Sequence, residues 1–402
     1  MNYITQKTKL LWIDQIASKS CEISDPSDFA CMDPYVEGKR IVLLGESSHG
    51  VGDFYTAKIN MIKYLHSVHG FNVVILESGL LEAVFCRRTL NGLPAREQIQ
   101  HGLLDIYHNE EMLPLFQETW ANEMHLAGMD IQPAYPLISQ NMLEWLKIHT
   151  EEELYASIHQ AETVFFNIDK EIGGQTKIPK KIKAKIQMCM DLYHSSLELF
   201  EYRLEEADWK KEKIFHIIRK GLENRLKWLE INTKSWISSG VMRGTYMFRN
   251  LQWLLEEYYN GEKVIVWAHN FHIRKSKTVA SKLFGITNVG QLLTKCYGDQ
   301  VYSIGFYAGE GEFASLLRVN FPIVVSKRQL ESLFMDACGH DSFVPLCEKG
   351  LPKRNWLNRR WRLLEAGMMG LLPIAIYPQE HYDGIMFCRK VKPPVYFMNS
   401  LP

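Results

Sequence analysis

One stretch near the N-terminus restricts the fold more than any other part of the chain. Residues 41–44 (IVLL) form an apolar run of strand length, and residues 73–76 (VVIL) form a second run of the same kind. Between them, apolar residues recur at spacings of three and four, as on one face of an amphipathic helix: Tyr55, Ile59, Ile62 and Leu65. Strands that are apolar on both faces are typical of parallel strands covered by helices. The stretch therefore predicts a βαβ unit.

The helix of this unit has a signal at each end. Asp53 stands where a side chain could cap the first turn by accepting backbone hydrogen bonds. Gly70 follows the last apolar position, where a residue in the left-handed conformation commonly ends a helix. We therefore expect a helix that is capped by Asp53 and terminated at Gly70.

Similar apolar runs recur at residues 125–129, 264–267 and 301–304, and each predicts a further strand. From about residue 142 to residue 239 such runs are absent, and long patterns of helical period replace them. The expected fold is therefore α/β, an open and mostly parallel sheet flanked by helices, with a large all-helical insertion. We divide the chain into an N-terminal half of the α/β core (1–140), the insertion (141–240) and a C-terminal half (241–402).

Composition excludes several classes of partner. The 402 residues contain 46 Lys and Arg against 46 Asp and Glu, so the net charge is zero. Nucleic acids and anionic membranes attract basic proteins, and we expect neither as a partner. No apolar run reaches the length of a membrane-spanning helix or of a signal peptide. The eight cysteines are scattered without a CxxC pair, which is typical of reduced core thiols in a cytoplasmic protein. The sequence does not indicate an oligomeric state.

Polar residues follow several of the predicted strands. In an open parallel sheet, ligands bind beyond the carboxyl ends of the strands, so these positions are the first candidates for a site. They are Glu46 and His49 after the first strand, Glu77 after the second, Asp130 after the run at 125–129, and His269, Asn270 and His272 after the run at 264–267. Convergence of such groups at one edge predicts a catalytic cleft.

The chemistry that this set offers is acid–base catalysis. His49 can change its charge near neutral pH and so suits a general base that takes a proton from water. Glu46 or Glu77 could orient that imidazole and stabilise its charged form. His269 and His272, together with a cation, could polarise a carbonyl and hold the oxyanion that develops. Such a set can hydrolyse an ester without a covalent intermediate.

Other chemistries have weaker support in the sequence. Ser47 and Ser48 adjoin His49, but the chain has no GxSxG nucleophile elbow. The spacing of His269 and His272 would allow a metal ligand pair, although the HExxH pattern is absent. No glycine-rich phosphate loop of the nucleotide-binding types is present. A hydrolase for another ester, or a non-catalytic protein that binds a metal or haem, stays open as an alternative.

Three segments carry a resemblance to a known family. They are IVLLGESSHGVGDFYTAKINMIKYLHSVHGFNVVILESG (41–79), VIVWAHNFHIRK (264–275) and GQLLTKCYGDQVYSIGF (290–306), with RGTYM (243–247) and DACG (336–339) in support. In these segments the chain resembles the erythromycin esterase family. The resemblance covers both halves of the predicted sheet and so most of the chain.

The resemblance implies hydrolysis of the macrolactone ester of 14-membered macrolides such as erythromycin, which confers antibiotic resistance. It implies an α/β core with a helical insertion, a small-molecule partner, and neither a metal nor a cofactor. Its catalytic residues would be His49 as general base, supported by Glu46, with Glu77, His269 and Arg243 in the same site. The expected substrate-binding residues are Lys58, His272, Asn270 and Asp130. Macrolide-hydrolysing relatives have arginine at the position of Lys58, and lysine keeps the charge but lacks the planar fork.

Overall fold

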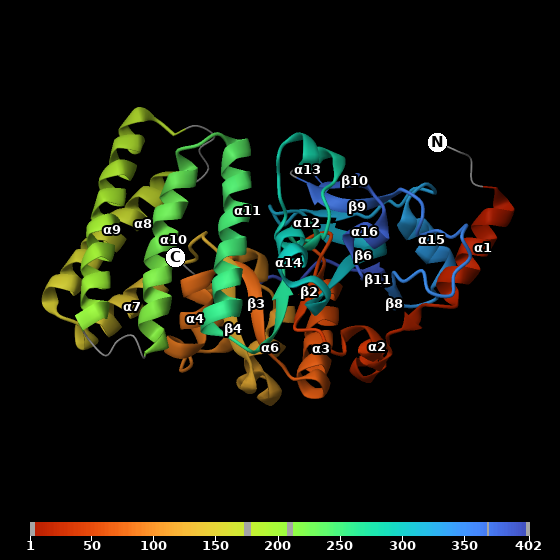
Figure 1. Cartoon of the computed structure of the whole chain (residues 1–402), viewed down its shortest axis with the longest axis horizontal. Coiled ribbons are helices and arrows are strands. Elements are labelled where there is room, and N and C mark those ends of the chain that lie inside the picture. The colour runs from red at the N-terminus through yellow and green to blue at the C-terminus, as the bar shows by residue number, and fades with distance from the viewer. Residues whose placement is uncertain (1–4, 173–177, 207–211, 368–369, 399–402) are drawn as a thin grey trace. The chain divides into compact units, whose positions relative to one another are not determined.

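The computed structural model describes residues 5–172, 178–206, 212–367 and 370–398 (Figure 1). The strands of its main sheet are β1 (Cys21–Glu22), β2 (Ile41–Leu44), β3 (Phe71–Gly79), β4 (His125–Asp130), β5 (Lys263–Trp267), β6 (Val301–Ala314), β7 (Asn320–Pro322), β8 (Ser342–Pro345) and β11 (Gly384–Val391). This nine-stranded sheet has the order β1-β8-β11-β6-β2-β5-β3-β4, and β7 pairs with β6. A separate antiparallel pair consists of β9 (Trp361–Gly367) and β10 (Gly370–Ile376).

The middle of the sheet is parallel. β11 pairs with β6, β6 with β2, and β2 with β5, all in parallel, whereas β8, β1 and β7 run antiparallel to their neighbours. Every residue of β2 is buried, as expected for a strand that is apolar on both faces. The predicted α/β class with an open, mostly parallel sheet is confirmed.

The chain divides into two compact units, and β3 runs from one into the other. The first unit comprises Met1–Val74, His108–Met124 and Gly261–Pro402. Its helices are α1 (Gln6–Ala17), α2 (Asp33–Val36), α3 (Gly52–His69), α6 (Pro114–Gln117), α12 (Asn270–Ile273), α13 (Val279–Leu283), α14 (Val289–Tyr297), α15 (Leu330–Ala337) and α16 (Pro378–His381). This unit contains most of the sheet and the residues that follow β2 and β5.

The second unit comprises Ile75–Tyr107 and His125–Asn260. Its helices are α4 (Leu80–Thr89), α5 (Ala95–Gly102), α7 (Pro136–His149), α8 (Glu152–Ile172), α9 (Lys180–Glu206), α10 (Lys213–Asn232) and α11 (Trp236–Trp253). α8 packs along α9, α10 packs on α4, and α11 packs on β4; the long helices are seen side by side in Figure 1. β4 and α4 pack with the long helices, so this compact unit includes residues before 141, and the division at residues 140 and 240 stays a prediction.

The helix of the predicted βαβ unit is α3, and one of its two end signals is correct. Gly70 has φ of +69° and its N–H bonds to the carbonyl oxygens of the last turn, so the left-handed end is confirmed. The predicted cap is wrong, since the N-cap residue is Val51 and its side chain makes no capping hydrogen bond. Asp53 lies inside the first turn, and its carboxylate accepts a hydrogen bond of 2.6 Å from the backbone N–H of Lys392.

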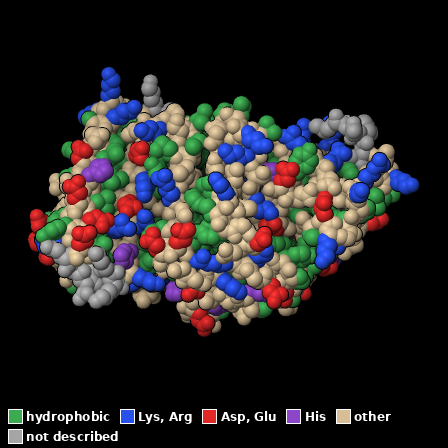
Figure 2. All heavy atoms as spheres, viewed as in Figure 1, with side chains coloured by type: hydrophobic (Ala, Val, Ile, Leu, Met, Phe, Trp, Pro, Cys, Tyr) green, Lys and Arg blue, Asp and Glu red, His purple; other side chains and the backbone are tan. Residues whose placement is uncertain are grey.

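The cysteines agree only in part with the prediction of core thiols. Cys86, Cys189, Cys338 and Cys388 are buried, whereas Cys296 and Cys347 are exposed, so the prediction is wrong for these two. Among the described residues, no helix combines the length and apolar character that crossing a membrane requires. On the face shown in Figure 2, acidic and basic side chains are interspersed rather than separated by sign. Location in the cytoplasm stays a prediction.

Candidate active site

A rigid loop connects β2 to α3 and carries Glu46 and His49. Its backbone carbonyls are held by neighbouring elements: Glu46 accepts from the N–H of Asn270 at 2.8 Å, Ser47 from that of Ala366 at 2.6 Å, and Gly50 from that of Ala314 at 2.8 Å. The Tyr55 hydroxyl donates to the carbonyl of His49 at 3.1 Å. Because so many of its polar backbone groups are paired, the loop holds its side chains in fixed positions before any substrate binds.

Gly50 allows the close approach between this loop and the end of β6, and its replacement should be costly. A Cβ atom at this position would lie 1.7 Å from the carbonyl oxygen of Ala314, so the two backbones would have to separate. We expect Gly50→Ala to lower the free energy of unfolding by about 3 kcal/mol, the upper end for overpacking. Denaturant unfolding measures the change.

Gly240→Ala is the matched control for this prediction. Gly240 lies in α11, and a Cβ atom there would meet nothing within 4 Å. Alanine should stabilise that helix by about 0.5–1 kcal/mol because it has the higher helix propensity. Equal stabilities of the two variants would show that the contact between Gly50 and Ala314 is not tight.

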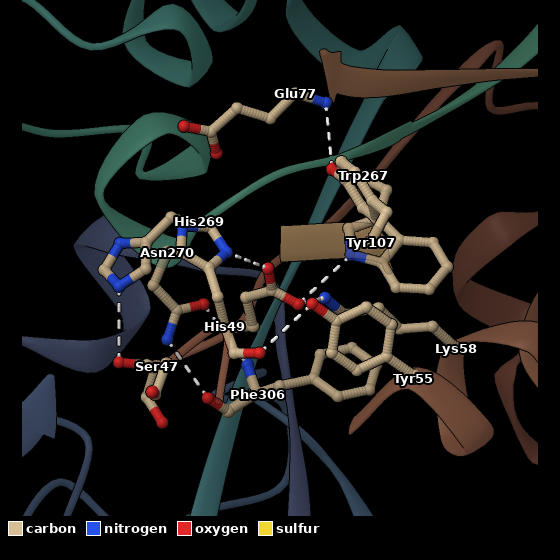
Figure 3. Close-up of polar contacts among 12 residues, drawn as sticks. Ser47, His49, Tyr55, Lys58, Glu77, Tyr107, Trp267, His269, Asn270 and Phe306 are labelled. Atoms are coloured by element: carbon tan, nitrogen blue, oxygen red, sulfur yellow. Dashed lines mark hydrogen bonds and ion pairs between the residues drawn. The ribbon is translucent and has the colours of Figure 1, made fainter. Parts of the chain in front are cut away.

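The carboxylate of Glu46 is completely buried and accepts hydrogen bonds on both oxygens. Oε1 lies 2.5 Å from Nδ1 of His49. Oε2 accepts from Nζ of Lys58 and, at 3.1 Å, from Nε1 of Trp267. Lys58 is also completely buried, and its ammonium lies 4.6 Å from the centre of the Trp267 ring. Figure 3 shows the side chains of Lys58, Trp267 and His49, which come from α3, from β5 and from the loop between β2 and α3.

Glu46 is ionised despite its burial. Loss of solvent opposes the negative charge, but the charge of Lys58 and the hydrogen bond from His49 outweigh that cost and lower the pKa of Glu46 to about 2. A buried carboxylate with a buried ammonium partner is a fixed negative charge at every physiological pH. It can therefore act on His49 without itself taking up a proton.

This fixed charge determines which nitrogen of His49 is available for chemistry. Glu46 accepts, so Nδ1 of His49 carries the hydrogen, and in the neutral imidazole the lone pair must then be on Nε2. The side chain of His49 has an exposed fraction of 18%, in contrast to Glu46. His49 thus has the tautomer and the exposure that a general base requires.

His269 is the N-cap residue of α12, and its tautomer is also fixed. Its Nδ1 accepts a hydrogen bond of 3.0 Å from the N–H of Phe271, so the ring hydrogen must be on Nε2. Nε2 in turn donates to the carbonyl oxygen of Ser47 at 3.3 Å, as Figure 3 marks with a dashed line. The rings of His49 and His269 lie 5.2 Å apart, so the structure brings these two predicted residues together.

The other two predicted residues after β5, Asn270 and His272, are buried. Asn270 is completely buried, and its carboxamide exchanges two hydrogen bonds with the backbone of Phe306, of 3.1 Å and 3.3 Å. His272 lies in α12 with an exposed fraction of 8%. The ammonium of Lys58 donates a hydrogen bond to the carboxylate of Glu46. Substrate binding by these three residues stays a prediction, and the hydrogen bonds of Asn270 and Lys58 favour a role for those two in holding the loops.

Three predicted residues form a second polar group, within the second unit. Arg243 of α11 pairs with Asp130 at the end of β4 through both Nε and one terminal nitrogen, and that nitrogen lies 3.6 Å from the carboxylate of Glu77. Asp130 also accepts hydrogen bonds from the N–H groups of Ile131 and Gln132. Burial disfavours the charge of Arg243, but Asp130 and Glu77 raise its pKa overall. The catalytic and substrate-binding roles of the three stay predictions.

Sequence reasoning missed Trp267, which contacts Glu46, and it did not mark Tyr396. Trp267 donates to the carboxylate from the end of β5, and its place as the last residue of an apolar strand concealed this role. The guanidinium carbon of Arg318 lies 4.6 Å from the ring centre of Tyr396. Burial raises the pKa of Tyr396 to about 12, the charge of Arg318 opposes this shift, and the charges of Glu111 and Glu46 add to it. No strand end or motif marked it in the sequence.

The arrangement in the first unit has the parts of a water-activating site. It contains a buried, ionised carboxylate, an imidazole that this carboxylate orients, and a second imidazole with a fixed N–H. Among the described residues, no three His, Cys, Asp or Glu side chains are grouped as ligands for a metal ion. Proton transfer from water by His49 is the chemistry that this geometry supports.

Comparison with known proteins decides the family. Residues 66–391 match the family model for erythromycin esterase, which is well over half of the chain. The chain belongs to the erythromycin esterase family. The resemblance found in the sequence is therefore confirmed, and the family supports a hydrolase.

Individual relatives are distant from this chain in sequence. YbfO of Bacillus subtilis, whose name gives a hydrolase but no substrate, is 26% identical over 96% of this chain and 91% of its own length. Erythromycin esterase type II of Escherichia coli is 24% identical over 72% of this chain and 74% of its own. The solved structure of a mutant of the erythromycin esterase EreC in its open conformation superposes with a TM-score of 0.69, at 18% identity, over 95% of this chain and 99% of that one. The last likeness shows the fold.

Proposed function

We propose that the protein hydrolyses the macrolactone ester of 14-membered macrolides, with water activated by His49. The observation that carries the proposal is the pair of His49 and Glu46, at 2.5 Å, in which a completely buried carboxylate leaves Nε2 of the imidazole as the basic nitrogen. Support for the macrolide comes from the family and from the relative named erythromycin esterase type II. Such an activity opens the macrocycle and gives antibiotic resistance.

The reaction uses one proton in two transfers. Nε2 of His49 takes a proton from water as the oxygen attacks the ester carbonyl, and the developing imidazolium is stabilised by the negative charge of Glu46. The same proton then passes to the departing alkoxide, which leaves a carboxylic acid and an alcohol. The one N–H of His269, on Nε2, makes a long hydrogen bond of 3.3 Å to the carbonyl oxygen of Ser47, and it turns from there to the tetrahedral oxyanion when that oxyanion forms. Lys58 acts by holding Glu46, and the mechanism takes no step through a metal.

A substrate panel tests this function. Purified protein is incubated with 14-, 15- and 16-membered macrolides and with simple aryl esters, and the products are weighed by mass spectrometry. Addition of one water to the 14-membered compounds is the expected result. If only the aryl esters are hydrolysed, the substrate is another ester and the macrolide proposal is wrong. Lys58 would then fit that result, since macrolide-hydrolysing relatives have arginine at its position. If no ester gains water, the hydrolase function is wrong.

The pH dependence of the rate provides a separate prediction. The pKa of Glu46 is lowered to about 2, so Glu46 is deprotonated at all pH values where the protein is assayed. The acid side of the kcat/KM profile should therefore show a single inflection, caused by protonation of His49, with a slope of one down to about pH 4. Stopped assays between pH 4 and pH 9 measure the profile. A second acid inflection in that range would mean that Glu46 titrates and is not the fixed charge.

A further inference from the structure

We propose that Glu365 is a positioning residue for this reaction, which acts through Arg274 and the carbonyl oxygen of Ser47 to hold His269. The inference rests on the proposed function for its kinetic consequences. It concerns a buried carboxylate on β9, outside the strand ends that carry the predicted site. All of the residues involved belong to the first unit.

Glu365 is the centre of a buried hydrogen-bond network. Its Oε1 accepts from the hydroxyls of Tyr307 at 2.7 Å and Tyr382 at 3.3 Å, and these two hydroxyls lie 3.0 Å from each other. Its Oε2 accepts from a terminal nitrogen of Arg274 at 3.0 Å. The side chains of Arg274 and Glu365 are exposed by only 4% and 3%. A buried ion pair of this kind adds little stability over apolar packing, so geometric restraint is its better explanation.

The two ends of this network reach the two loops of the site. Arg274 is the C-cap residue of α12, the short helix whose N-cap residue is His269, so Glu365 fixes the far end of the helix that presents His269. Ala366 follows Glu365 on β9, and its N–H donates to the carbonyl oxygen of Ser47 at 2.6 Å. Glu365 thus connects the loop after β5 with the loop after β2.

Ser47 is where the two connections meet. Its carbonyl oxygen accepts both the N–H of Ala366 and, at 3.3 Å, the Nε2–H of His269. A shift of β9 would move this oxygen, and a shift of α12 would move His269, so either one breaks the longer bond first. With that bond lost, the tautomer and ring orientation of His269 would no longer be fixed from the Nε2 side. Displacements of about 1 Å in catalytic groups can lower rates by about 10²-fold.

Glu331 of α15 provides a matched control, because it bonds to the same strand. It is completely buried, and its Oε1 accepts from the N–H of Leu364 on β9 at 2.5 Å. Burial and the nearby charge of Glu365 raise the pKa of Glu331 to about 8, so it is neutral at pH 7 and glutamine is a close replacement. Glu331→Gln and Glu365→Gln make the same atomic change, the first in a side chain that bonds to Leu364 of β9 and the second at the next residue of that strand. Only the second removes the charge that holds Arg274.

The test compares these two variants by kinetics and by the ¹⁵N resonances of the ring of His269, assigned with His269→Asn. We expect Glu365→Gln to lower kcat by about tenfold to a hundredfold with KM within twofold, and to shift or broaden the resonances of Nδ1 and Nε2. Glu331→Gln should change neither. If the resonances in Glu365→Gln equal those of the wild type, the inference is overturned whatever the rate.

The spectroscopic arm separates this inference from the proposed function. If the wild-type protein hydrolyses no ester, the function fails, yet the resonances of His269 still report whether Glu365 holds that ring. If kcat falls equally in both variants without a change in the resonances, the loss is structural and the positioning role is wrong. Changed resonances in Glu365→Gln alone support the role in either case.

Discussion

Replacement of His49 by alanine should lower kcat for ester hydrolysis by about 10³-fold or more, while the protein stays folded. In the proposed mechanism Nε2 of His49 is the base nitrogen, and general-base catalysis contributes about 10²–10⁴-fold to such reactions. The loop should survive, because the carbonyl of His49 and those of its neighbours are held by backbone and hydroxyl donors. Initial rates by product mass and the far-ultraviolet circular dichroism spectrum measure the two effects.

His340→Ala is the control for this change. His340 also faces a carboxylate, that of Glu22 at 3.5 Å, but both side chains are more than half exposed. Loss of this surface pair should leave the rate unchanged and the stability within about 1 kcal/mol. A His49→Ala protein that retains a near-native rate would remove His49 from the role of base, whereas equal losses in both variants would point to a general effect of histidine removal.

The main residues of the candidate site in the loops after β2 and β5 could be predicted from the sequence by the rule that ligands bind beyond the carboxyl ends of parallel strands. Parallel strands end at a common edge, so Glu46 and His49 after β2 and His269 after β5 could be placed together from the order of the strands and the residues that follow them. The same rule could not assign roles to Lys58 and Asn270. Their burial depends on what packs above them, and Phe306, which engages the carboxamide of Asn270, lies far away in the sequence.

The sequence does contain a signal for the role of Lys58. Lys58 lies at helical spacing between Tyr55 and Ile62 of α3, so it belongs to the apolar face of that helix. A lysine on a buried face needs a buried anion, and Glu46 is the carboxylate that follows the adjacent strand. The compact units were less predictable, since helical periodicity marks 141–240 but does not reveal that α4 and β4 pack against α10 and α11.

Glu46→Gln should damage both activity and stability, for two separable reasons. The amide cannot stabilise the imidazolium of His49 by charge, so kcat should fall by about 10⁴-fold, as when the orienting carboxylate of a Ser-His-Asp triad is replaced by its amide. The buried ammonium of Lys58 would also lose the carboxylate with which it pairs, and breaking a buried pair from one side costs about 3–5 kcal/mol. Rates and denaturant unfolding of the same preparation measure the two losses.

The double variant Glu46→Gln/Lys58→Met separates these losses. Methionine fills the space of the lysine stem without a charge, and Trp267 can still donate to the amide oxygen, so most of the lost stability should return. The rate should stay low, because the negative charge beside His49 is still missing. Recovery of both stability and rate would mean that Glu46 matters only as the partner of Lys58. Recovery of stability alone identifies Glu46 as the residue that makes His49 a base.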